Sequence, residues 1–223
     1  MKKISLFMVF AIIAVSLFAQ TDGKTAGQSM SEDFQALQTA NNLAAYGYAA
    51  RSASALICAA EILSSVHTQP LNVTAQVEGT QVGTTNIDTP DFTPANLLAD
   101  ARRFAGNDRT MTTWATEVER ALSSSTRGAA GGPQFARNTL NGGQSLTYNI
   151  TFRGMEFAQV FVSGNGSSDL DLYVYDSNGR LVASDDDWTD QCYVCFFPLT
   201  RGTYSVKIVN YGNRANRFEL YTD

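Results

Sequence analysis

Apolar and polar residues alternate along the C-terminal part of this chain, and this pattern constrains its fold most. In the segment LDLYV, the residues at Leu170, Leu172 and Val174 are apolar and the two between them are polar or amphipathic. Side chains two positions apart point to the same face of a β-strand. The alternation therefore predicts strands with one buried face and one face toward solvent.

Turn signals divide this part of the chain into short segments. They are Asn141-Gly142-Gly143, Arg153-Gly154, Gly164-Asn165-Gly166, Ser177-Asn178-Gly179, Arg201-Gly202 and Tyr211-Gly212-Asn213. Turns spaced by roughly 8 to 12 residues are typical of antiparallel sandwiches and jelly rolls. We therefore expect seven or eight short strands around one two-sheet core. The expected core residues are Leu146, Tyr148, Ile150, Phe152, Val160, Val162, Leu170, Leu172, Val174, Val194, Phe196, Tyr204, Val206, Ile208, Phe218 and Leu220.

The preceding residues have the helical period instead. Apolar residues at spacings of three and four predict a helix over 29–66, with Ser29 and Glu32 as a capping box. Thr93-Pro94 is a typical helix start, and a further helix is expected from about Asp108. The sequence thus predicts an α+β, multidomain protein in which a small N-terminal helical bundle precedes an antiparallel β-sandwich or jelly roll.

The expected domain limits follow from these periods. Residues 29–122 form the helical domain, with a loose hairpin or surface loop at 70–93. Residues 123–134, rich in Ser, Gly and Ala, form a linker, and residues 135–223 form the sandwich. Because the linker has no apolar period, we expect the two domains to be separable.

The N-terminus indicates export. Lys2 and Lys3 precede a run of apolar residues at 4–18, and Ala19 is a small residue at its end. This pattern predicts a signal peptide over residues 1–19 and a secreted or periplasmic protein without a membrane span after its removal. Cleavage would leave 14 basic against 21 acidic residues, because Lys2 and Lys3 are lost from the 16 basic residues of the chain. This acidity argues against nucleic acid as a partner.

Several segments of the sandwich region resemble a known family. The series SDLDLYVYD, SDDDWTD, FPLTRGTYSVKIVNYG and NRFELYTD is similar to the bacterial pre-peptidase C-terminal domain. That resemblance covers residues from about 135 to 223 and implies a jelly-roll sandwich of the kind found behind secreted proteases and in many exported proteins. No peptidase domain of ordinary size precedes it here, and the helical part resembles no family. The resemblance also implies calcium, which some related domains bind, notably those of collagenases.

Aspartates gather in this same region. The candidate calcium ligands are Asp169, Asp171, Asp185, Asp187 and Asp190. Calcium takes six to eight oxygen ligands and is abundant outside cells. The loop lacks the glycine and the glutamate of an EF-hand. The alternative interpretation is an exposed acidic loop whose carboxylates accept hydrogen bonds from backbone N–H groups.

Other candidate residues are few. Tyr173 and Tyr175 share the polar face with Asp169 and Asp171 and are candidate contact residues, with ordinary packing as the alternative. Cys192 and Cys195 lie three apart in a predicted strand, on opposite faces, which predicts two free thiols rather than a disulfide.

Catalytic motifs are missing from the sequence. His67 is the single histidine, and neither G-x-S-x-G nor H-E-x-x-H occurs. The sequence therefore favours an exported, non-catalytic binding or accessory protein whose sandwich presents a surface to an extracellular polymer or protein. The alternatives are a secreted hydrolase with an unrecognised helical catalytic domain, or a structural envelope protein.

Overall fold

A computed structural model describes residues 29–87, 90–125 and 131–223. The predicted signal peptide at 1–19 lies outside these residues. No helix within the described ranges is long and apolar enough to cross a membrane.

The first predicted helix is two helices in the structure. Helix α1 spans Glu32–Ala50 and helix α2 spans Ala53–Ser65. The chain turns between them at Arg51, whose left-handed φ of 50° ends α1. The N-cap of α1 is Ser31 rather than the predicted Ser29, because the Ser31 hydroxyl accepts a hydrogen bond from the Phe34 backbone.

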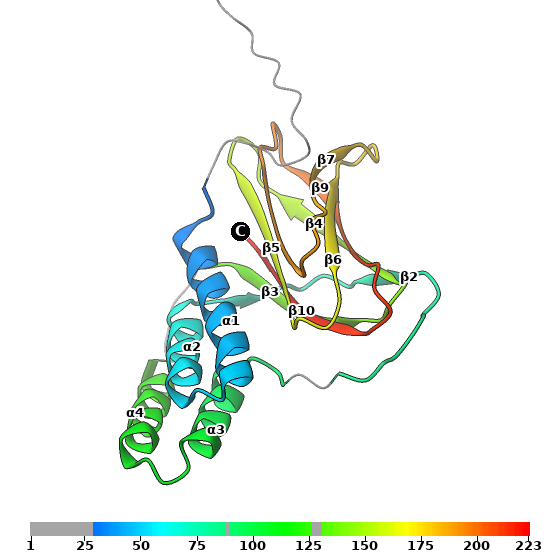
Figure 1. The fold of residues 1–223 in the computed structure, drawn as a ribbon. Helices are drawn as coiled ribbons and strands as arrows, with labels where there is room; N and C mark the ends of the chain where they lie inside the picture. Colours follow the sequence, from blue (N-terminus) through cyan, green and yellow to red (C-terminus); the bar gives the residue numbers. More distant parts are fainter. Residues whose placement is uncertain (1–28, 88–89, 126–130) are drawn as a thin grey trace, which may run out of the picture.

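Helices α3 and α4 follow after a long connection. Helix α3 spans Pro94–Ala105 and begins as predicted, with Thr93 accepting a hydrogen bond from the Asn96 N–H at 3.2 Å. Helix α4 spans Arg109–Ser125. The four helices form a bundle in which α2 contacts α1, α3 and α4 (Figure 1). Alanine and leucine side chains fill its core, and small alanines permit the helices to approach closely.

Within the described ranges, ten strands form two five-stranded sheets, so the predicted α+β class is confirmed. Their bounds are β1 Gln69–Pro70, β2 Gln76–Glu78, β3 Gln134–Leu140, β4 Ser145–Phe152, β5 Ala158–Gly164, β6 Leu170–Tyr175, β7 Leu181–Asp185, β8 Gln191–Phe196, β9 Gly202–Asn210 and β10 Asn216–Thr222. Sheet A has the order β1-β3-β10-β5-β8, and sheet B has the order β2-β4-β9-β6-β7. All pairs are antiparallel except β1 with β3.

The sandwich core lies between the two sheets and contains the residues that the alternation predicts, together with Leu140, Ala158, Ala183 and Cys192. Every predicted core residue belongs to this cluster, with Tyr204 at its partly buried margin. Phe152 packs edge to face against Phe196, with ring centroids 5.1 Å apart. The period of two fixes the face of each strand, which is why this prediction succeeds.

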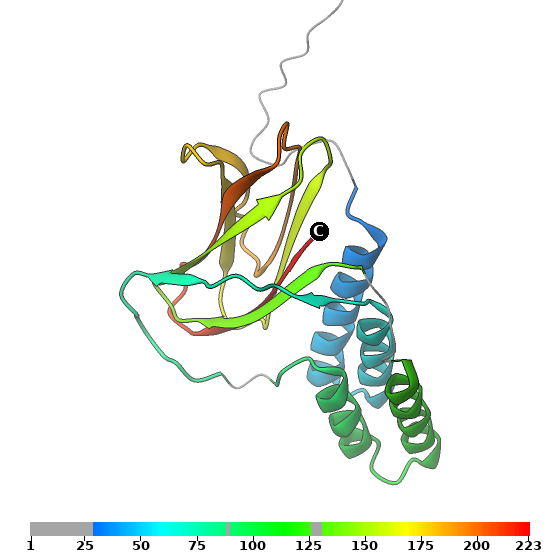
Figure 2. The ribbon, with the colours of Figure 1, turned by 180° about the vertical axis from the view of Figure 1, so that it is seen from behind.

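The segment predicted as a hairpin or loop at 70–93 joins the sandwich. Strand β1 pairs with β3, and β2 pairs with β4, so the segment contributes an edge strand to each sheet and no hairpin of its own. Figure 2 shows it running along the sandwich before it returns to α3. Gly132 permits the close approach beside β1, because a Cβ there would lie 1.9 Å from the His67 carbonyl oxygen.

Helix α1 packs on the outer face of sheet A. Phe34 and Leu37 of α1 pack with Phe161 of β5 and Tyr221 of β10 in a separate buried cluster. The Phe34 and Phe161 ring centroids are 6.1 Å apart. In the described part of the chain the helices lie on this side of the sandwich (Figure 1). The outer face of sheet B carries exposed side chains such as those of Asn149 and Thr203.

Candidate functional site

Aromatic and polar side chains line the outer face of sheet B. The register aligns Tyr173 of β6 with Lys207 of β9 and Thr147 of β4. It aligns Tyr175 with Ser205 and Asn149 in the next row. Tyr211 follows the end of β9 and is 67 % exposed. We call these seven residues the tyrosine face.

Hydrogen bonding and stacking hold the central tyrosines in place. The Tyr173 and Tyr175 rings are nearly parallel, with centroids 6.5 Å apart. The Tyr173 hydroxyl donates to the Asp171 carboxylate at 2.8 Å. Burial and this hydrogen bond raise the pKa of Tyr173, so its phenol stays protonated in neutral solution. The register places Asp171, Tyr173 and Tyr175 on the outer face of sheet B, and the role of the two tyrosines as contact residues stays a prediction.

Two shallow hollows lie on this face and meet at Tyr175 and Lys207. One has a volume of about 400 Å³ and reaches Tyr211, and the other has a volume of about 490 Å³ and reaches Thr203. The Lys207 ammonium lies 3.8 Å from the Glu78 carboxylate, which offsets its charge. From Val209 to Thr203 the hollows follow about six residues of strand, or roughly 20 Å. The face can thus contact an extended chain along several of its units.

Besides Asp171, which accepts from Tyr173, three candidate calcium ligands accept hydrogen bonds from nearby groups. The Asp185 carboxylate accepts from the Tyr193 N–H at 2.9 Å. Asp187 accepts from the N–H and the hydroxyl of Thr189, at 3.0 and 2.7 Å. Asp190 accepts from the Gly166 N–H at 2.6 Å and from the Asn216 amide at 2.8 Å. These contacts match the alternative interpretation of backbone-capping carboxylates.

The other two candidate ligands repel their neighbours. Burial raises the pKa of Asp169, and the charges of Asp187 and Asp190 raise it further. Burial also raises the pKa of Asp171, against the lowering effect of the Tyr173 hydroxyl. Asp171 faces outward, whereas Asp185 pairs with the inward-facing Leu172, so the two lie on opposite faces of sheet B.

The fit of calcium to these residues is incomplete. One oxygen of Asp169 is buried without a hydrogen bond, as a metal ligand would be. Among the described residues, however, no three His, Cys, Asp or Glu side chains are placed to hold a metal ion. Calcium at Asp169, Asp171, Asp185, Asp187 and Asp190 therefore stays a prediction.

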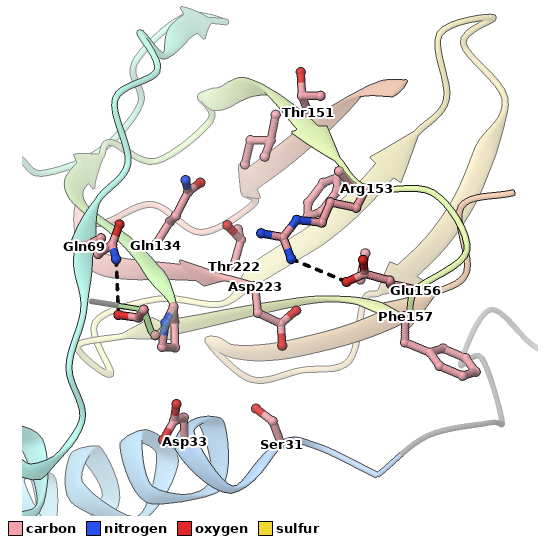
Figure 3. A pocket seen from close by; sticks show the side chains of 16 residues that line it. Ser31, Asp33, Gln69, Gln134, Thr151, Arg153, Glu156, Phe157, Thr222 and Asp223 are labelled. Atoms are coloured by element: carbon pink, nitrogen blue, oxygen red, sulfur yellow. Dashed lines mark hydrogen bonds and ion pairs between the residues drawn. The ribbon is translucent and has the colours of Figure 1, made fainter. Parts of the chain in front are cut away.

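A separate cavity opens where α1 meets the end of the sandwich. Its volume is about 500 Å³, and Figure 3 shows Arg153 reaching across it toward Glu156, with Asp33 and Asp223 on its other side. The Arg153 guanidinium and the Glu156 carboxylate are 3.6 Å apart. Burial raises the pKa of Asp223, and the charge of Asp33 adds to the effect.

His67 and the cysteines offer no assembled catalytic group. His67 is exposed beyond the end of α2. Cys192 and Cys195 are free and buried, as the strand geometry predicts, and burial raises the pKa of both thiols. Raised pKa values disfavour the thiolate that nucleophilic catalysis needs.

Sequence reasoning missed part of these sites. Lys207 could have been found, because the alternation of strand 202–210 places it on the polar face with Tyr173. Tyr211 gave no signal beyond a turn dipeptide. The cavity residues Asp33, Glu156 and Asp223 come from three distant segments, and the sequence contains no pattern that joins them.

Comparisons with known proteins give weak similarity to several solved structures. No protein-family model matches the chain. The pre-peptidase C-terminal domain of collagenase from Bacillus anthracis is 14 % identical, with 41 % of this chain and 89 % of that chain covered and a TM-score of 0.37. The periplasmic g-type lysozyme inhibitor PliG of Aeromonas hydrophila is 13 % identical, covers 41 % of this chain and 84 % of its own, and has a TM-score of 0.32.

A third similar structure contains a further type of module. The CBM22-1-GH10 modules of xylanase 10B from Clostridium thermocellum, complexed with xylohexaose, are 16 % identical with a TM-score of 0.24, and cover 43 % of this chain and 22 % of that chain. At these TM-scores the similarities assign neither a family nor a ligand.

Proposed function

We propose that this protein is an exported, non-catalytic binding protein whose sandwich attaches to an extracellular polysaccharide through the tyrosine face. The observation that carries the proposal is the arrangement of Tyr173, Tyr175 and Tyr211 beside hydroxyl and amide side chains on an uncovered sheet face. The positively charged, apolar N-terminus at 1–19 supports export.

The chemistry of the face favours sugar rings over peptide segments. Tyrosine offers a flat apolar surface with a polar end, which matches a sugar ring that has apolar C–H faces and hydroxyl edges. Thr147, Asn149 and Ser205 can both donate and accept hydrogen bonds, as sugar hydroxyls require. An extended peptide would instead pair with an exposed sheet edge through backbone hydrogen bonds. The face offers side chains only, and few of them are apolar.

A retention assay on insoluble polymers tests the proposal. The full chain should be retained on peptidoglycan or chitin and not on collagen. Tyr175→Ala and Tyr211→Ala should each weaken retention about tenfold, which corresponds to roughly 1.4 kcal/mol for an aromatic contact residue. Tyr46→Ala is the matched control, because Tyr46 on α1 is 61 % exposed and far from this face.

Other results would favour the alternatives. Retention on collagen alone, lost in Tyr175→Ala, would replace the polysaccharide by a protein ligand. Soluble products released from any polymer would favour the secreted hydrolase. Retention on none of the polymers would contradict the proposal and favour the structural envelope protein.

A further inference from the structure

Four large apolar side chains are exposed on two neighbouring loops at one end of the sandwich. Met155 and Phe157, between β4 and β5, are 71 % and 44 % exposed. Phe197 and Leu199, between β8 and β9, are 42 % and 74 % exposed. The Phe157 and Phe197 rings contact edge to face, with centroids 5.0 Å apart, so the loops form one surface. We call these four residues the apolar tip.

The backbone holds the two loops together. The Met155 N–H donates to the Pro198 carbonyl at 2.8 Å. Met155 adopts a left-handed φ of 62°, a conformation that a long side chain rarely takes without support. Gly154 permits the contact, because a Cβ there would lie 2.5 Å from the Arg201 nitrogen. The apolar tip is therefore preorganised, which lowers the entropy lost when a partner binds.

The cavity next to the tip is acidic. Phe157 belongs both to the apolar tip and to the cavity lining, and Figure 3 shows it beside Glu156, with Asp223 and Asp33 on the other side. Arg153 is the cation in the cavity lining, and it pairs with Glu156. The carboxylates of Asp33 and Asp223 therefore give the cavity a net negative charge. The Asp223 carboxylate accepts two hydrogen bonds from Gln159, at 2.9 and 3.1 Å, which fixes its position.

We propose that the apolar tip and this cavity form a docking surface for a partner protein segment in which a basic side chain lies beside an aromatic or aliphatic one. The apolar side chain would pack on Phe157 and Phe197, and the basic one would enter the cavity toward Asp33 and Asp223. Exposed apolar patches bordered by charges mark interaction sites. Burial of aromatic anchors with a complementary charge is how compact protein interfaces gain both affinity and specificity. The surface shares no residue with the tyrosine face, so the proposal stands independently of the proposed function.

The competing occupant is a membrane surface. Apolar loop tips can enter a bilayer interface, and Arg201 beside the tip would favour anionic lipids. The carboxylates of the adjacent cavity oppose the same lipids, which is the charge argument for a basic protein segment. Both occupants are therefore included in the experiment.

Chemical-shift mapping on the ¹⁵N-labelled full chain tests the proposal. The probes are N-acetyl-Phe-Arg-amide and its charge-reversed counterpart N-acetyl-Phe-Glu-amide. The arginine probe should shift resonances of 153–157, 197–201 and Asp33, and the glutamate probe should not. The double variant Asp33→Asn, Asp223→Asn should weaken binding of the arginine probe at least fivefold. Glu61→Gln, an exposed carboxylate on α2, is the control and should leave binding unchanged.

Three results would overturn the proposal. Equal shifts from both probes would show that the cavity carboxylates do not select a basic side chain. No shifts from either probe would show that the surface does not bind such a segment. Co-sedimentation with vesicles of phosphatidylcholine and phosphatidylglycerol, lost in Phe157→Ser, would assign the apolar tip to a membrane. Phe157→Ser changes an exposed ring, so folding is expected to survive, and its ¹⁵N spectrum away from the loops checks this.

Discussion

At the scale of single residues, the burial of Asn41 lowers the stability of the folded protein. It lies on α1 against sheet A and is 3 % exposed, yet its amide nitrogen and oxygen have no hydrogen-bond partner in the described structure. A small cavity of about 20 Å³ adjoins it. An unsatisfied buried amide destabilises a protein by roughly 1–3 kcal/mol.

Replacing Asn41 by leucine, which has the same branched shape, should therefore stabilise the protein. We expect Asn41→Leu to raise the free energy of unfolding by about 1 kcal/mol in urea titration. Asn42→Leu is the control, because the Asn42 side chain accepts a hydrogen bond from Gln191 at 2.7 Å and should lose stability when replaced. A loss of stability in Asn41→Leu would show that solvent in the cavity satisfies the amide.

The three cysteines should differ in reactivity. Burial raises the pKa of all three thiols, those of Cys58, Cys192 and Cys195. Cys58 is the least buried of the three. At pH 8 iodoacetamide should label Cys58 first and label Cys192 and Cys195 only after unfolding, with all three found as free thiols by mass spectrometry. A Cys192–Cys195 disulfide in the exported protein would contradict the opposite-face geometry.

At the scale of elements, the calcium prediction concerns the acidic loop between β7 and β8 and the neighbouring strand β6, and thermal unfolding tests it. A cation held by the folded state alone stabilises it by RT ln(1 + [L]/Kd), about 2.7 kcal/mol at a hundredfold excess over Kd. Millimolar calcium should then raise the melting temperature by several degrees, and Asp171→Asn combined with Asp187→Asn should abolish the rise. Glu61→Gln serves again as the control. Identical melting curves in calcium and in chelator would leave these carboxylates with their capping role alone.

The same scale shows what the sequence could predict. The sandwich core was predictable because side chains in a strand alternate between its two faces, so the apolar residues of Leu146–Phe152 must share the buried face. The break between α1 and α2 was not, because it depends on the left-handed turn at Arg51 and on the tight contact of Gly47 with Leu56. Strands β1 and β2 are too short and too exposed to show a period.

The candidate sites were predictable in the same partial way. Tyr173 and Tyr175 follow from strand alternation within one segment. The cavity at the end of the sandwich follows only from the docking of α1. Phe34 and Leu37 of α1 pack on sheet A, but they have the same helical spacing as residues of the bundle core. Spacing alone therefore could not predict that they contact the sheet rather than the other helices.

At the scale of the whole molecule, the helices and the sandwich interlock. Residues before α3 contribute β1 and β2 to the two sheets, and α1 buries Phe161 and Tyr221. The predicted linker at 123–134 overlaps the end of α4 and the start of β3, and residues 126–130 of it lie outside the described residues. Separating the parts would expose two aromatic rings and two sheet edges to water.

Limited proteolysis tests whether the two predicted domains are separable. Cleavage within the linker should yield two fragments that elute together in gel filtration under native conditions and separate only in denaturant. Phe161→Ala should loosen the pair, because it removes a fully buried ring from the contact with α1. A folded all-β fragment that elutes alone would instead support two independent domains.

The central claim is that the outer face of sheet B binds polysaccharide, and mapping the bound ligand tests it most directly. The ¹⁵N-labelled full chain is titrated with the soluble hexamer of N-acetylglucosamine, the sugar present in both chitin and peptidoglycan. We predict shifts confined to outward residues of β4, β6 and β9, including Tyr173, Tyr175 and Lys207, with sheet A unchanged. Shifts confined to the helices or to the cavity beside Arg153, or no shifts in protein that is retained on the polymer, would contradict the claim.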